Sequence, residues 1–170
     1  MDSKKRVEEG IKKAIEAEGT GYHFYMMASS KTEDTKGKKI FEALANEELE
    51  HVRFLRAQLA SLTETGNVNS AIELSAPKVD EAGASPIFSA ELKSRIGDAH
   101  YEMTALSIGI QLELSSMNFY KEEAEAAEDP DVATMYRSLM DWEGGHYDML
   151  KRQQDNLRED YWAEGGFNPF

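Results

Sequence analysis

The chain contains one sequence pattern twice, at a constant offset of 95 residues. At this offset Glu18 aligns with Glu113, and Phe24-Tyr25 aligns with Phe119-Tyr120. The match continues without a gap through six further identities, which are Leu44/Leu139, Glu48/Glu143, His51/His146, Leu55/Leu150, Gln58/Gln153 and Leu62/Leu157. Such a run indicates an internal duplication, so both halves must adopt the same local structure.

Each half has the apolar spacing of two amphipathic helices. The periodicity predicts helices over residues 3 to about 30, about 35 to 64, about 89 to 127 and 130 to about 157, with an interruption near Gly97 as an alternative in the third. Asp34 or Thr35 is the expected N-cap of the second helix, and Pro130 is suited to the first position of the fourth. There are no alternating β-branched runs, so the fold class is all-α.

The lengths of the connections predict a four-helix bundle in a single domain, 1–170. Short loops make the pairs 3–64 and 89–157 antiparallel hairpins. The connection 66–88 is rich in Gly, Asn and Pro, and is long enough to cross the length of the bundle. The C-terminal tail 158–170 is too short for a fifth long helix.

The inward-facing stripes of these helices carry charges where a bundle needs apolar residues. Glu48 and His51 lie between Leu44 and Leu55, and the second half repeats this arrangement. Isolated carboxylates are too costly to bury unpaired, so a positive group must lie among them. The residues concerned are Glu18, Glu48, His51, Glu113, Glu143 and His146.

Their spacing predicts a dinuclear metal centre. Glu and His at i, i+3 point into a common volume, and one Glu from each remaining helix completes the ligand set used by carboxylate-bridged metal pairs in four-helix bundles. Two carboxylates would bridge the ions, and the other two would each bind one ion together with a His. Oxygen-rich ligation with one imidazole per ion favours two Fe ions, with Mn or Zn as alternatives.

Composition excludes several other functions. The net charge of −13 argues against nucleic acid and anionic membranes as partners. The absence of Cys excludes disulfides, Cys-ligated metals and thiol catalysis within these residues. No segment has the apolar length of a membrane span or the pattern of a signal peptide, so we expect a cytoplasmic protein.

Several polar residues near the expected ligands have two interpretations. Tyr25 and Tyr120 lie two turns beyond Glu18 and Glu113 on the same faces, where they are either hydrogen-bonding or redox-active neighbours of the metals or core aromatics with satisfied hydroxyls. Glu47, Glu50 and Asp141 are expected on the solvated surface.

The motifs resemble those of rubrerythrins. The shared elements are the segments Glu18–Tyr25 and Glu113–Tyr120, the sequence ALANEELEH and the sequence DWEGGH. The resemblance covers about 3–62 and 98–157, and implies a ferritin-like fold. It also implies a diiron centre held by the six residues above, reaction with peroxide or dioxygen, and a homodimer.

Two departures from the family pattern matter. Rubrerythrins usually carry a four-cysteine rubredoxin-like iron site, so the resemblance implies that electrons come here from a separate donor protein. A further Glu often follows the third-helix ligand by one turn, where this chain has Ser116, the repeat mate of Gly21. Alternative functions are iron handling by ferroxidation and transient binding without substrate turnover, and a metal-stabilised interaction module without chemistry.

Overall fold

The computed structural model describes residues 3–75, 87–94 and 99–164. Within this part of the chain all regular structure is helical. The elements are α1 (Ser3–Lys31), α2 (Thr35–Thr65), α3 (Ala90–Ser94), α4 (His100–Ala126) and α5 (Pro130–Glu164). The four long helices match the four expected from the apolar period, which confirms the all-α class.

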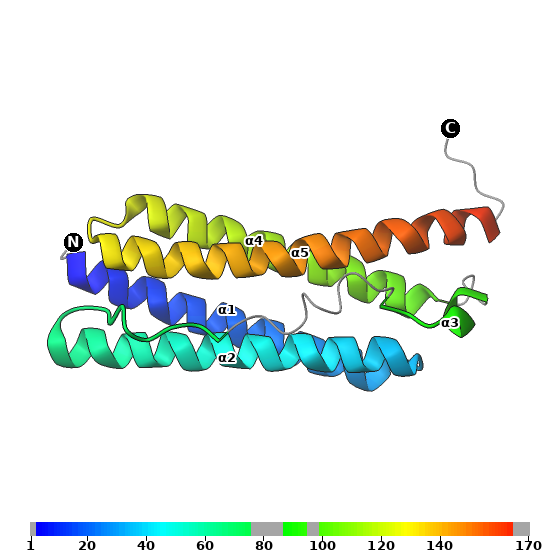
Figure 1. Cartoon of the computed structure of the whole chain (residues 1–170), viewed down its shortest axis with the longest axis horizontal. Coiled ribbons are helices and arrows are strands. Elements are labelled where there is room, and N and C mark those ends of the chain that lie inside the picture. Colours follow the sequence, from blue (N-terminus) through cyan, green and yellow to red (C-terminus); the bar gives the residue numbers. More distant parts are fainter. Residues whose placement is uncertain (1–2, 76–86, 95–98, 165–170) are drawn as a thin grey trace.

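The helices form two antiparallel hairpins packed side by side (Figure 1). The α1 helix packs along α2, and α4 packs along α5, while direct contact between the hairpins runs mainly along α1 and α4. The α2 helix ends at one end of the bundle and α3 lies at the opposite end (Figure 1), so the second hairpin starts where the predicted crossover would deliver it. The middle of that connection, 76–86, lies outside the described residues.

Local chemistry explains where α2 begins and ends. Asp34 is the N-cap, and its side chain accepts a hydrogen bond from the amide of Gly37 at 2.7 Å. Gly66 ends the helix at φ 87°, a left-handed conformation that glycine adopts without a steric cost, and its amide donates to Leu62. Pro130 opens α5, as its position after Asp129 predicts.

Two boundaries differ from the expectation. The predicted third helix consists of the short α3 followed by α4, and the expected break near Gly97 falls in 95–98, outside the described residues. The α5 helix continues to Glu164, so assigning everything from residue 158 to a tail was wrong. Arg158 stabilises the extra turns, because it pairs with Asp155 and its guanidinium lies 4.9 Å from the ring centre of Trp162.

The apolar core is divided into two clusters along the bundle. One contains Tyr25, Leu44 and Leu150, and the other contains Tyr120, Leu55 and Leu139. Each helix therefore passes from one apolar cluster to the other, and the predicted Glu and His residues occupy the turns between them. This polar layer therefore has one apolar cluster on each side along the bundle.

The two ends of the crossover are held by the same residue type from each repeat. Gln58 on α2 accepts a hydrogen bond from the amide of Asn69 and donates to its carbonyl, at 2.8 and 3.0 Å. Its repeat mate Gln153 on α5 accepts from the amide of Ile87 at 2.9 Å. Asp34 adds a further anchor, since it accepts hydrogen bonds from both the amide and the hydroxyl of Ser89.

Asp34 should therefore contribute more to stability than its repeat mate. Asp34→Ala removes the cap of α2 and the anchor of Ser89, whereas Asp129→Ala removes only a local bond to the amide of Asp131. We expect Asp34→Ala to lower the free energy of unfolding by about 1–2 kcal/mol through the cap alone, and Asp129→Ala to lower it less. Urea denaturation of both variants measures this; equal losses would contradict it.

Candidate metal centre

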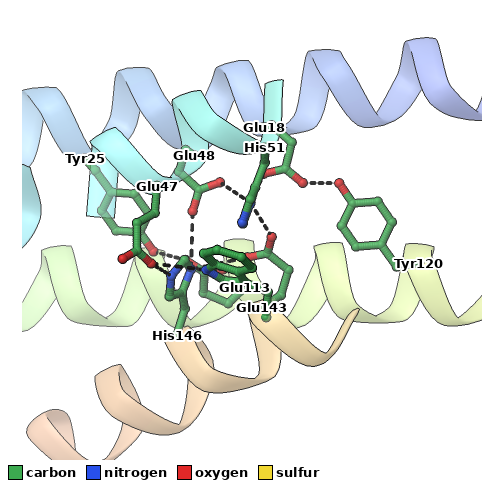
Figure 2. Close-up of polar contacts among 10 residues, drawn as sticks. Glu18, Tyr25, Glu47, Glu48, His51, Glu113, Tyr120, Glu143 and His146 are labelled. Atoms are coloured by element: carbon green, nitrogen blue, oxygen red, sulfur yellow. Dashed lines mark hydrogen bonds and ion pairs between the residues drawn. The ribbon is translucent and has the colours of Figure 1, made fainter. Parts of the chain in front are cut away.

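All six residues expected to bind metal lie together in the polar layer between the two apolar clusters (Figure 2). None of them is more than 3% exposed. They come from all four long helices: Glu18 from α1, Glu48 and His51 from α2, Glu113 from α4, and Glu143 and His146 from α5. The repeat therefore places equivalent side chains around one buried volume.

Their ligand atoms form two overlapping groups. One group contains Glu18 and His51, the other contains Glu113 and His146, and Glu48 and Glu143 belong to both. In each group the ligand atoms lie within 4.8 Å of one another. This is the arrangement of two ion positions that share two carboxylates, with one further Glu and one His at each position.

Unpaired polar atoms in this layer fit a cation rather than a hydrogen-bonded core. Oε1 of Glu48, Oε2 of Glu143 and Nδ1 of His146 are buried and have no hydrogen-bond partner within the described residues. Buried acceptors without donors carry a large desolvation cost that a bound cation removes. Carboxylate oxygens with one imidazole per position suit Fe or Mn, so the donor set fits a pair of such ions.

The tyrosines hold the outer carboxylates from across the bundle. The hydroxyl of Tyr25 donates to Oε1 of Glu113, and the hydroxyl of Tyr120 donates to Oε1 of Glu18 (Figure 2). In both cases Oε2 is left facing a histidine, with His51 Nδ1 at 3.3 Å from Glu18 and His146 Nδ1 at 3.7 Å from Glu113. Each tyrosine thus fixes which oxygen of the opposite glutamate faces the interior.

Glu47 is a polar residue that the sequence interpretation missed. It was expected on the surface, but it is buried, and its Oε2 accepts a hydrogen bond from Trp142 Nε1 at 3.1 Å and lies 2.7 Å from Nε2 of His146. A signal was present, because Glu47 lies three residues after Leu44 and seven before Phe54, both of which are buried. The apolar stripe of α2 is wide enough to include it.

A solvent-open cleft of about 330 Å³ between α1 and α4 reaches this layer. It is lined by Glu48, Glu113 and Tyr25, and its walls include the small residues Gly21 and Ser116. Ser116 occupies the position at which the sequence resemblance implies a further Glu. The short serine side chain leaves room for a small molecule to approach the shared carboxylate.

Comparison with known proteins identifies the family. The sequence profile described as Rubrerythrin matches residues 9–154, which includes all six candidate ligands. The chain belongs to the rubrerythrin family. Neither the curated proteins nor the solved structures gave a match. None of the helices in the described part of the chain combines the length and apolarity needed to cross a bilayer.

Crowding of the carboxylates shifts the pKa values within the layer. Burial, followed by the charges of Glu143 and Glu48, raises the pKa of Glu18 well above its ordinary value, and the same causes raise the pKa of Glu113. Burial alone would lower the pKa of the two histidines, but the facing carboxylates of Glu143 and Glu113 raise it well above the ordinary value. The metal-free layer therefore retains protons that a cation must displace.

Metal affinity should consequently increase with pH. Because the pKa values of Glu18 and Glu113 are raised, both carboxyls hold protons at pH values where an exposed Glu is ionised, and metal binding must release them. Calorimetric titrations with Co²⁺ in buffers of different ionisation enthalpy should show proton release and weaker binding at lower pH. Binding without proton release between pH 5 and 7 would contradict this.

The shared carboxylates should be essential for metal binding. We expect the double variant Glu48→Gln, Glu143→Gln to lose both ions, because Glu48 and Glu143 each belong to both ligand groups. Metal at 100 times its Kd should stabilise the wild-type protein by about 2.7 kcal/mol for each ion bound and should not stabilise the variant. The control is Glu42→Gln, Asp141→Asn, which makes the same charge change at exposed positions of α2 and α5. Retention of two ions by the Glu48, Glu143 variant would contradict the assignment.

Proposed function

We propose that this protein is a diiron oxidoreductase that reduces hydrogen peroxide, with dioxygen as a second oxidant. The observation that carries the proposal is the pair of overlapping ligand groups sharing Glu48 and Glu143, in a member of the rubrerythrin family. Two adjacent ions can supply the two electrons of a peroxide reduction in one encounter. In balanced form, H₂O₂, two protons and two electrons give two waters.

The residues of the layer have separate roles in this proposal. Glu18 and His51 would bind one ion, Glu113 and His146 the other, and Glu48 and Glu143 both. Tyr25 and Tyr120 keep the outer carboxylates of Glu113 and Glu18 in place by their hydrogen bonds. With both hydroxyls committed to these carboxylates, the ligand geometry is set before an ion binds.

The cleft between α1 and α4 supports access by a small oxidant. Its volume of about 330 Å³ is several times that of a water molecule, whose share of liquid volume is about 30 Å³. The cleft adjoins Glu48 and Glu113, so a peroxide entering here would meet one shared and one outer carboxylate. The apolar walls formed by Leu112 and Phe119 limit the amount of ordered water at the site.

We further propose an electron donor, a cellular compartment and an oligomeric state for this chemistry. The proposed reductant is a separate electron-donor protein. The reducing cytoplasm is the compartment that would regenerate the ferrous pair. The proposed assembly is a homodimer, and nucleic acid and membranes are not expected partners of a chain with net charge −13.

Steady-state peroxide consumption tests the proposal. Iron-loaded protein supplied with excess reductant should consume many equivalents of H₂O₂ per ion pair, and the Glu48→Gln, Glu143→Gln variant should lose at least 100-fold in rate, because its ion pair is absent. Consumption that stops after one equivalent per pair would favour iron handling instead. Ferrous protein whose absorption spectrum is unchanged by air and by peroxide would favour a metal-stabilised interaction module.

A further inference from the structure

The duplication is broken at the positions that precede the shared carboxylates. Glu47 and Trp142 are repeat mates at the 95-residue offset, and each is buried. Each lies against the histidine of the opposite half: Glu47 hydrogen bonds with His146, and the ring of Trp142 packs edge to face on His51 with centroids 4.9 Å apart. The two histidines therefore have chemically different supports.

His146 is held as a metal-binding imidazole. Its Nδ1 faces the layer, 3.4 Å from Glu143 and 3.5 Å from Glu48. Its Nε2 donates to Oε2 of Glu47 at 2.7 Å (Figure 2), so Nε2 keeps its proton, and the proton that a cation would displace from the ring is the one on Nδ1, which faces the layer. Trp142 Nε1 donates to the same oxygen, so Glu47 is itself fixed by two donors.

His51 faces the layer in the same way but lacks this support. Its Nδ1 lies 2.9 Å from Oε1 of Glu143. Its Nε2 is buried and has no hydrogen-bond partner in the described part of the chain. The aromatic ring of Trp142 occupies the place where the symmetric arrangement would put a carboxylate. An imidazole without an acceptor on its outer nitrogen is a less basic and less firmly oriented ligand.

We infer that the two ion positions are unequal, and that the position of Glu113 and His146 binds its ion more tightly than the position of Glu18 and His51. A carboxylate bonded to the outer nitrogen of a ligating histidine typically raises metal affinity 10- to 100-fold. Glu47 is thus a positioning residue for one of the two ions. The protein would fill in a fixed order, with one resident ion and one exchangeable ion. This inference rests on the proposed metal pair and is independent of peroxide chemistry.

Stepwise Co²⁺ titration of the metal-free protein tests the inference, with visible absorption and calorimetry as readouts. The wild-type protein should bind two ions in two resolved steps. E47Q keeps the size of the side chain but removes its charge, so it should weaken the tighter step by about 10- to 100-fold and leave the weaker step unchanged. The two steps should then converge.

Trp142→Phe is the matched control. It keeps an aromatic ring against His51 and removes the indole N–H that donates to Glu47, while the hydrogen bond between Glu47 and His146 remains, so the two steps should stay separated. A merely structural role of Glu47 would weaken both steps together in E47Q. Three results would each overturn the inference. They are a weakening of both steps in E47Q, an E47Q titration identical to that of the wild-type protein, and two indistinguishable sites in the wild-type protein.

Further measurements test the inference if E47Q does not fold, and they separate its failure from failure of the metal centre or of the proposed function. If E47Q does not fold, proton NMR of the wild-type protein loaded with Zn²⁺ decides: one strongly downfield imidazole N–H, assigned to His146, supports the inference, and two equivalent resonances overturn it. Wild-type protein that binds no Co²⁺ or Zn²⁺ would overturn the metal centre and this inference together. Absence of peroxide turnover with two resolved binding steps would overturn only the proposed function.

Discussion

Four carboxylates enclosed in one apolar core are the constraint on which the rest of this structure depends. Glu18, Glu48, Glu113 and Glu143 are almost completely removed from water, where their mutual repulsion is least screened. Every surrounding feature offsets that cost: the histidines provide positive charge, the tyrosines donate hydrogen bonds, and the two apolar clusters keep the helices together on either side. Without a cation the layer relieves its repulsion by retaining protons.

The same constraint explains why the sequence was so informative about the site. Glu and His in a stripe of Leu and Phe have no ordinary structural role. The repeat contains these charged residues on the apolar faces of both halves. The helix pairing followed from the apolar period and the short loops. The six residues gathered by the structure are those that the pattern singled out, and their identity as ligands is a prediction for the metal titrations to decide.

The sequence did not predict contacts between residues that the helical spacing of apolar positions does not relate. Glu47 was expected on the solvated surface, and only the side-chain contacts between α2 and α5 show that it meets Trp142 and His146. The end of α5 was missed for a related reason, because the stacking of Arg158 on Trp162 stabilises a segment whose composition resembles a tail. Both errors concern individual side-chain contacts, one between two helices and one along a single helix, that the apolar period does not specify.

Neither hairpin alone contains a complete ligand group. Each ligand group takes three residues from one half of the chain and one from the other, and each tyrosine holds a glutamate of the opposite half. A single hairpin with these residues could therefore have brought a complete ligand set together only as a dimer of identical chains, and duplication would have turned an intermolecular site into an intramolecular one. Once the halves were covalently joined, positions 47 and 142 were free to diverge, a specialisation that a symmetric dimer could not have evolved.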